Sequence, residues 1–169
     1  MALEHLFRYG HENILFVRGD KGDSYRIKEE VYRSVMQERG TFSPQNIVDV
    51  GEGNRLETVD NTMYVLMDLM LTLSATAIFC CNDMMGAGAV NACQRMERSV
   101  PGDISVIGFD NTPLSQFLMP KLTTVDQRMT ELGTAAAGLM LETIEHGTTR
   151  SIVLENRLVE RETTGYRKE

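Results

Sequence analysis

The sequence is poor in the residues that disulfide frameworks, metal sites and membrane spans require. Its 169 residues include no tryptophan, four prolines and three cysteines, which are Cys80, Cys81 and Cys93. An odd number of cysteines, two of them adjacent, gives neither a disulfide framework nor a metal-ligand spacing, so we expect buried, reduced thiols and no metal site. No apolar run reaches the roughly 18 residues of a membrane-spanning helix, and we expect no membrane partner. The first ten residues lack the apolar core of a signal peptide.

Sequence signatures of catalysis and of cofactor binding are also missing. There is no phosphate-binding Gly-x-x-x-x-Gly-Lys-Ser/Thr loop, no Gly-x-Ser-x-Gly nucleophile elbow and no His-Glu-x-x-His zinc motif. The glycines within residues 51–53 lack the third glycine of a dinucleotide fingerprint. His5, His11 and His146 are scattered, and we expect each of them at the surface or at a helix end. We therefore expect neither an enzyme nor a bound cofactor.

The charge balance of the chain is acidic. With 17 Lys and Arg against 24 Asp and Glu, the net charge is −7, and the isoelectric point is about 5.0. A surface that neutralises phosphates needs the opposite sign, so we do not expect this chain to bind nucleic acid by itself. The hydrophobic share of 42% is that of an ordinary globular domain, and the length is enough for one sizeable core.

Short apolar runs alternate with segments of helical periodicity along most of the chain. We expect strands at residues 13–17, 46–50, 75–81, 104–109 and 122–125. We expect helices at residues 24–39, 57–72, 83–97 and 130–146. Such alternation predicts an α/β fold, a doubly wound and mostly parallel sheet with helices on both faces. Two further extended runs, at residues 151–154 and 157–159, indicate a hairpin or a bent strand.

The helix expected at residues 24–39 has recognisable ends and one apolar face. Ser24 is the candidate N-cap, and Gly40 is the candidate stop after the last turn. The residues that we expect to share its buried face are Ile27, Val31, Tyr32, Val35 and Met36.

Polar side chains follow the expected strands at the point where each one ends. They are Asp20, Lys21, Ser24, Asn82 and Asp110. Ligands of open parallel sheets bind beyond the carboxyl ends of the strands, and carboxylates and amides suit a ligand with many hydroxyl groups or a heterocycle. An equally simple interpretation is that Asn82 and Asp83 only cap the following helix and that Asp110 only begins a turn.

Three segments carry a family resemblance. Residues 77–89 read AIFCCNDMMGAGA, residues 100–111 read VPGDISVIGFDN, and residues 122–127 read LTTVDQ. In this order they resemble the ANDxxAxGA, VPxDISVxGFDD and LTTVxQ segments of lactose-repressor/galactose-repressor (LacI/GalR) type transcription regulators. The opening residues 6–17 and the closing residues 160–165 are similar to further segments of that family.

The resemblance implies part of a two-lobed effector-binding domain with the periplasmic-binding-protein type I fold. We expect residues 1–169 to be a truncated form of it, with residues 11–121 forming the C-terminal lobe. Residues 122–147 would be a strand and helix that normally belong to the N-terminal lobe, and residues 148–169 would return to the C-terminal lobe. The helix-turn-helix of the family would lie outside this sequence, and DNA would be bound only through it. The family also implies a cytoplasmic homodimer.

Matching positions give five candidate ligand-binding residues, which are Asp110, Asn82, Lys28, Ser24 and Gln127. Asp110 matches the ligand-binding aspartate, and Asn82 matches the asparagine that lines the pocket in sugar-responsive members. Lys28 stands where many members have an arginine three residues before a glycine, and that glycine is Val31 here. Lysine lacks the planar fork of arginine, which weakens this assignment.

These observations favour the effector-sensing part of a LacI-type regulator, with a sugar or sugar derivative as effector. Ligand-driven closure of two lobes would control operator binding by the missing helix-turn-helix. The alternative is a periplasmic sugar-binding protein of a transporter, although adjacent free cysteines disfavour an oxidising compartment. A third hypothesis, an α/β enzyme using Asp83 or Asp110, lacks an activated nucleophile, a metal cluster and a cofactor loop.

Overall fold

A computed structural model describes residues 1–51, 53, 55–147 and 149–168 of the chain. Its centre is a six-stranded sheet in the order β2-β1-β3-β4-β5-β6. The strands are β1 (Ile14–Arg18), β2 (Ile47–Asp49), β3 (Ala77–Cys80), β4 (Ser105–Phe109), β5 (Thr123–Asp126) and β6 (Arg157–Val159). The first five strands pair in parallel, and β6 pairs antiparallel with β5. The helices are α1 (Ala2–Arg8), α2 (Asp23–Glu38), the 3-10 turn η1 (Pro44–Asn46), α3 (Glu57–Met70), α4 (Asp83–Arg95), α5 (Leu114–Phe117) and α6 (Met129–His146).

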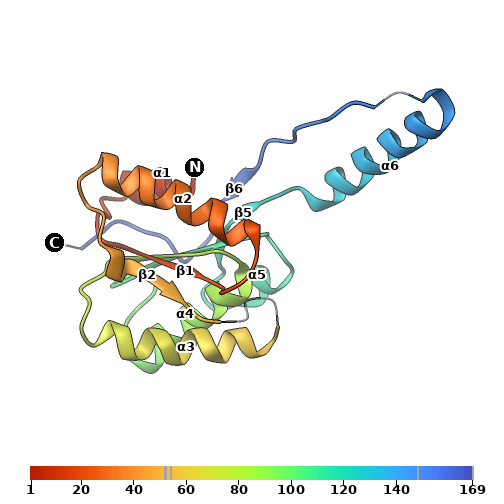
Figure 1. The fold of residues 1–169 in the computed structure, drawn as a ribbon. Coiled ribbons are helices and arrows are strands. Elements are labelled where there is room, and N and C mark those ends of the chain that lie inside the picture. Colours follow the sequence, from red (N-terminus) through yellow and green to blue (C-terminus); the bar gives the residue numbers. More distant parts are fainter. Residues whose placement is uncertain (52, 54, 148, 169) are drawn as a thin grey trace.

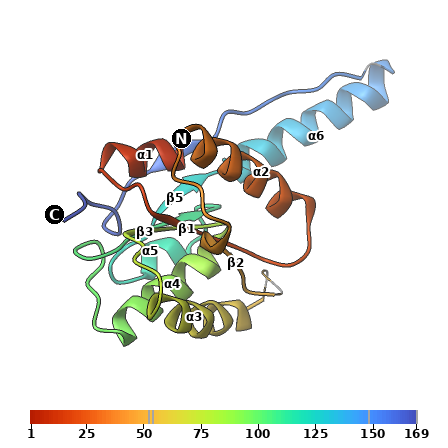
Figure 2. The ribbon, with the colours of Figure 1, turned by 60° about the vertical axis from the view of Figure 1, so that its left-hand side comes forward.

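Helices cover both faces of the sheet. In Figures 1 and 2, α1 and α2 lie above the sheet, and α3 and α4 lie below it. β1 and β3 are almost fully buried because both of their faces are covered. Phe16 of β1 stacks on Tyr32 of α2 with ring centroids 4.8 Å apart, which ties the upper layer to the sheet. The doubly wound, mostly parallel sheet expected from the sequence is confirmed.

The two ends of α2 differ in how well the sequence predicted them. Gly40 has a φ of +69° just after the helix, as a glycine stop requires. Ser24 is not the N-cap, because the helix begins at Asp23 after Gly22 and has no side-chain cap. Ile27 and Val31 were expected to be buried, but they are 53% and 56% exposed. Both line a cavity of about 460 Å3 beside Leu3 and Phe7 of α1 and are not covered by it.

The chain after β4 departs most from the expected pattern. The short helix α5 lies where a loop was expected. At the other end of the chain, α1 was not expected. Residues 122–125 were expected to leave this lobe together with the following helix, but β5 lies within the sheet, between β4 and β6. Residues 151–154 form no strand, whereas the run at 157–159 is β6.

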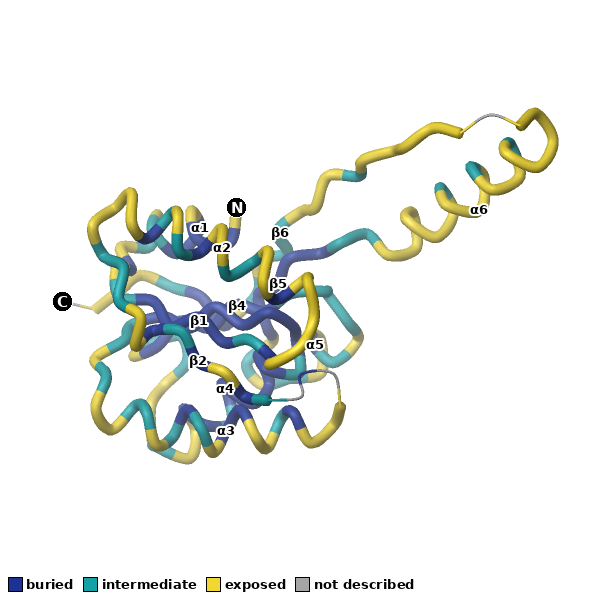
Figure 3. Tube along the Cα trace, in the orientation of Figure 1, coloured by how far each residue is buried: buried dark blue, intermediate teal, exposed yellow. Residues whose placement is uncertain are grey.

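Helix α6 extends away from the rest of the molecule. None of its described residues is buried, and Figure 3 shows the helix and most of the returning segment as exposed. No helix within the described residues is long and apolar enough to cross a membrane.

We expect this exposed helix to make the isolated chain self-associate. Met140, Leu141 and Ile144 are each more than half exposed, and a contiguous apolar surface of this kind is unfavourable in water. Light scattering should therefore show a dimer or larger species, and Leu141→Glu with Ile144→Glu should shift it toward monomer. Phe117→Glu on α5, where Phe117 is also exposed, is the matched comparison. A monomer with α6 ordered and exposed would contradict the prediction.

The three cysteines are free and buried, as expected. Burial raises the pKa of the Cys81 and Cys93 thiols to about 12, so neither is a reactive thiolate at neutral pH.

Two of the three histidines are buried, and only His11 contradicts the expectation, because His5 lies in the last turn of α1 and so near a helix end. His5 and His11 are 1% and 2% exposed. The Nε2 atom of His5 lies 2.9 Å from the hydroxyl of Thr164, and the Nε2 atom of His11 lies 3.0 Å from the carbonyl of Gly165. Both histidines therefore hold the C-terminal segment against α1 and β1. His146 is exposed near the end of α6, as expected.

We expect the chain to lose stability as the pH falls below about 6.5. Burial lowers the pKa of both His5 and His11 below the usual 6.5, although the nearby Glu160 carboxylate partly opposes this at His5. The unfolded chain then takes up protons first, so the contribution of the neutral imidazoles is complete above pH 6.5 and is lost below it. The urea concentration at the midpoint of unfolding should decrease as the pH is lowered from about 7.5 to about 5. His11→Gln should weaken this dependence and His146→Gln should leave it unchanged, whereas equal slopes in both variants would contradict it.

Candidate functional site

Three of the five candidate ligand residues meet where β4 and β5 end. Asp110 follows β4 directly, and its backbone N–H donates to the Val125 carbonyl of β5 at 2.8 Å. The side-chain amide of Gln127 donates to the Asp110 carboxylate. The ammonium of Lys28 lies 3.8 Å from the centre of the Phe109 ring and donates to the Cys81 carbonyl at 3.1 Å.

The two charges in this cluster are partly desolvated. Burial raises the pKa of Asp110, while Lys28 and the hydrogen bond from Gln127 oppose the rise. Burial likewise lowers the pKa of Lys28, against the attraction of Asp110 and Cys81. Burial therefore disfavours the charged form of Asp110, and its carboxyl oxygens are acceptors for ligand hydroxyl groups.

The backbone around Asp110 is strained. Asp110 and Asn111 have φ values of +107° and +53°, and Arg128 has +55°. All three line one cavity of about 670 Å3, together with Gln127 and the start of α6. Positive φ is uncommon for residues other than glycine, and such strain gathers at functional sites. The cavity lies where the chain leaves the sheet for α6.

Asn82 caps the helix that follows it, as the second of the two interpretations predicted. Its side-chain oxygen accepts the N–H of Met85 at 2.9 Å. Its side-chain nitrogen donates to the Gly53 carbonyl at 2.6 Å and to the Tyr25 hydroxyl at 3.3 Å. The amide nitrogen carries two hydrogens, and both therefore have protein partners.

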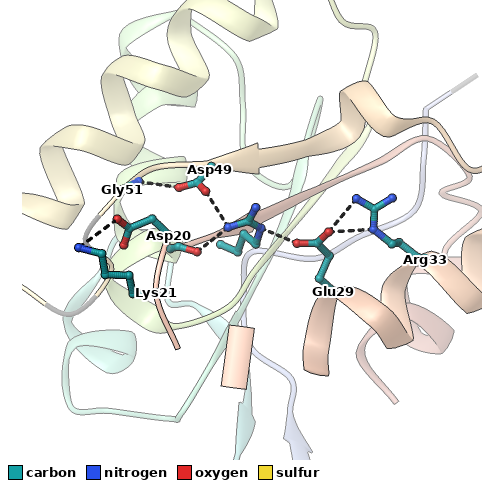
Figure 4. A network of polar contacts seen from close by, with 8 residues as sticks. Asp20, Lys21, Glu29, Arg33, Asp49 and Gly51 are labelled. Atoms are coloured by element: carbon teal, nitrogen blue, oxygen red, sulfur yellow. Dashed lines mark hydrogen bonds and ion pairs between the residues drawn. The ribbon is translucent and has the colours of Figure 1, made fainter. Parts of the chain in front are cut away.

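The remaining candidates lie beside β1 and are exposed. Asp20 and Lys21 follow β1 and pair with each other at 3.9 Å, and Ser24 is in the first turn of α2. Figure 4 shows the ion-pair network beside them, in which Arg18 joins Asp49 of β2 at 2.6 Å and Glu29 of α2. This network fixes α2 against the sheet. The structure thus separates the exposed residues after β1 from the Lys28, Asp110 and Gln127 cluster.

Asp83 belongs to the core and not to the site. Its carboxylate is 1% exposed and accepts the N–H of Thr112 at 2.6 Å, the hydroxyl of Thr112 at 2.9 Å and the hydroxyl of Thr124 at 2.6 Å. Occupied in this way, it is not a candidate catalytic acid. Among the described residues, no group of three histidine, cysteine or acidic side chains is placed to hold a metal.

Two site residues escaped the sequence analysis. Phe109 precedes Asp110 and forms the floor under Lys28, and Tyr25 is a buried tyrosine beside Asn82. The sequence feature that could have identified Phe109 was its place at the end of an apolar, buried strand. For Tyr25 the signal was an aromatic residue beside two glycine-containing loops.

Comparison with known proteins places the chain in a family. A sequence profile described as periplasmic binding protein-like domain matches residues 3–164. The HTH-type transcriptional repressor PurR of Haemophilus influenzae is 34% identical over 150 residues, which are 86% of this chain and 43% of that protein. The ribose operon repressor of Halalkalibacterium halodurans is 32% identical over 167 residues, 97% of this chain and 49% of that protein. The chain therefore spans about half the length of these repressors.

Solved structures agree with this placement. A LacI family regulator of Enterococcus faecium with bound ribose has a TM-score of 0.83 at 25% identity, over 99% of this chain and 62% of that one. A LacI family regulatory protein of Chloroflexus aggregans has a TM-score of 0.85 at 26% identity, over 97% and 59%. These relatives are regulators and not enzymes, in agreement with the sequence analysis. The chain belongs to the periplasmic binding protein-like domain family, in the form found in the effector-binding domains of LacI-type regulators.

Proposed function

We propose that this chain is the effector-sensing part of a cytoplasmic LacI-type transcription regulator that binds a sugar or sugar derivative. The observation that carries the proposal is the cluster of Asp110, Gln127 and Lys28 at the strained exit from the sheet. The carboxylate accepts from hydroxyl groups, the amide both donates and accepts, and the ammonium only donates. The ribose bound to the Enterococcus faecium relative supports this class of ligand.

The mechanism that we propose is a shift between two arrangements of two lobes. Residues 11–121 and 148–169 supply the C-terminal lobe. Of residues 122–147, the strand β5 stays in this lobe and the helix α6 packs on the N-terminal lobe. The absence of buried residues from the described part of α6 supports this division. An effector bound at Asp110 and Gln127 would touch the point where the chain crosses between lobes, so it favours one arrangement over the other. In a homodimer this changes the spacing of two DNA-binding segments, which lie outside these residues.

The acidic charge of the chain fits a regulator in which one segment senses the effector and another segment binds DNA. With a net charge of −7, these residues supply little attraction for phosphates. The alternative, a periplasmic sugar-binding protein of a transporter, shares the fold but is not favoured by the repressors among the relatives.

The coding DNA upstream of residue 1 tests the proposal directly. An in-frame helix-turn-helix followed by the first half of a binding lobe would support a regulator. A signal peptide in that place would overturn the proposal in favour of the transporter alternative. A native start at residue 1 would leave one lobe alone and would rule out closure between two lobes.

We expect the isolated chain to bind ribose weakly or not at all. In the proposed mechanism the ligand is held between two lobes, so a single lobe offers only about half of the contacts. These contacts must still overcome the entropy that the ligand loses on binding. Calorimetry should give a dissociation constant above about 1 mM. Submillimolar binding of ribose would contradict the division of the site between two lobes.

A further inference from the structure

Tyr25 is a buried aromatic residue at the meeting point of three loops. It lies in the first turn of α2 and is 7% exposed. A Cβ atom on Gly19, after β1, would come within 2.7 Å of its ring, and one on Gly53, after β2, would come within 2.5 Å of its hydroxyl. Both glycines therefore leave space that the tyrosine ring occupies. Gly19 also lies directly against the segment after β2, because the same Cβ atom would come within 3.0 Å of the Gly51 carbonyl oxygen and 3.2 Å of the Gly53 Cα atom.

The hydroxyl of Tyr25 extends the same junction to the end of β3. It accepts one hydrogen of the Asn82 amide at 3.3 Å, while the other hydrogen goes to the Gly53 carbonyl at 2.6 Å. Since the Asn82 oxygen caps α4, the side chain has no donor left for a ligand. An effector could take a hydrogen bond from Asn82 only by displacing Tyr25 or Gly53.

Backbone bonds lock the two loops to each other beside the ring. The N–H of Asp20 donates to the Gly51 carbonyl at 2.8 Å, and the N–H of Val50 donates to the Arg18 carbonyl at 3.0 Å. These bonds hold the ends of β1 and β2 together, beside a smaller cavity of about 340 Å3 that Gly19, Asp20 and Tyr25 help to line. The charged cluster with Asp110 stays open on the β4–β5 side, where a cavity of about 670 Å3 adjoins it.

We propose that Tyr25 is the positioning and specificity-determining residue of the effector site. The sequence alone would assign this role to Asn82. Tyr25 holds the loops after β1 and β2 in place and takes the hydrogen that Asn82 would otherwise offer to a ligand. Effector hydroxyl groups are then recognised by Asp110 and Gln127 on the opposite side. This inference rests on the proposed function for its ligand, but the contacts that it concerns exist without any ligand.

The test separates the hydroxyl of Tyr25 from its ring in the ligand-free chain. Tyr25→Phe should change the chemical shift of the Asn82 side-chain amide and speed exchange of its hydrogens on the order of tenfold. Tyr25→Leu should in addition speed exchange of the Asp20 and Val50 backbone amides by a similar factor, because the ring no longer supports their bonds. Tyr64→Phe and Tyr64→Leu, at an exposed tyrosine of α3, should change neither.

Each result decides the proposal. Unchanged Asn82 amide signals in Tyr25→Phe would overturn it, and so would unchanged protection of the Asp20 amide in Tyr25→Leu. Should Tyr25→Leu fail to fold, Gly53→Ala displaces the ring through its added methyl group and must speed the same exchange. These measurements need no effector. The coding DNA upstream of residue 1 tests the proposed function and amide exchange tests this inference, so the failure of one can be told from the failure of the other.

Discussion

Asp110→Asn is expected to stabilise the folded chain while it removes effector binding. Burial raises the pKa of this carboxyl, so the folded state favours its neutral form and ionisation opposes folding at neutral pH. Asparagine is neutral, can still accept from Gln127, and tolerates the φ of +107° better than most residues. We expect the free energy of unfolding in urea at pH 7 to rise by about 1 kcal/mol. The gain should shrink as the pH falls toward 3.8, the usual pKa of the carboxyl, because Asp110 itself then becomes neutral.

The same substitution removes the charged acceptor that we assign to the effector. Losing a hydrogen bond to a charged group costs about 2 to 3 kcal/mol, which corresponds to about 30- to 150-fold in affinity. Effector response should be measured in the intact gene product, because both lobes are needed for it.

Asp126→Asn is the matched control for Asp110→Asn. Burial there works against ionisation, but the N–H of Arg128 and the guanidinium of Arg157 hold the pKa of the Asp126 carboxyl below its usual value. Asn should therefore lower stability at this position, the opposite sign from Asp110. A loss of 1 kcal/mol or more in Asp110→Asn would show that its carboxylate supports the fold and would contradict the assignment.

The sheet could be predicted from the sequence because its signal is local. Residues 14–17 and 77–80 form continuous apolar runs, and only a strand covered on both faces needs such a run. The cluster at Asp110 was predictable for a related reason, since the carboxyl ends of parallel strands meet at one edge. Asp110 and Gln127 are 17 residues apart in sequence and share a hydrogen bond because β4 and β5 are neighbours.

What the sequence could not show depends on contacts between distant segments. His5 and His11 look like surface residues until the C-terminal segment, more than 150 residues away, supplies Thr164 and Gly165 as partners. The periodicity of α2 predicted a buried place for Ile27, but burial requires a covering element, and periodicity alone does not provide one. Tyr25 was missed because its importance lies in the absence of side chains at Gly19 and Gly53.

Asp83→Ala is expected to destabilise the chain by about 3 kcal/mol in urea at 25 °C. The change leaves two partly buried donors of Thr112 and the buried hydroxyl of Thr124 without their acceptor. Each unsatisfied buried group costs about 1 to 3 kcal/mol, and the Thr112 donors recover part of this by contact with water. Gly108 shows how closely this carboxylate is packed, because a Cβ there would lie 2.6 Å from its oxygen. Asp83→Asn should cost less than Asp83→Ala, since it keeps one acceptor oxygen.

Asp68→Ala, at an exposed position of α3, is the control and should stay within about 0.5 kcal/mol of the parent chain. Asp83 and Asp110 both follow strands of the same sheet and both have a pKa raised by burial. They differ in their partners, because Asp83 has three donors from its own chain and Asp110 has the amide of Gln127 beside an open cavity. The predicted signs follow from that difference: Asp83→Ala removes the acceptor of three hydrogen bonds and destabilises the fold, whereas Asp110→Asn removes a buried charge and stabilises it. A stabilising Asp83→Ala would mean that burial of the charge outweighs its three bonds, and the distinction between structural and ligand-binding aspartates would then fail.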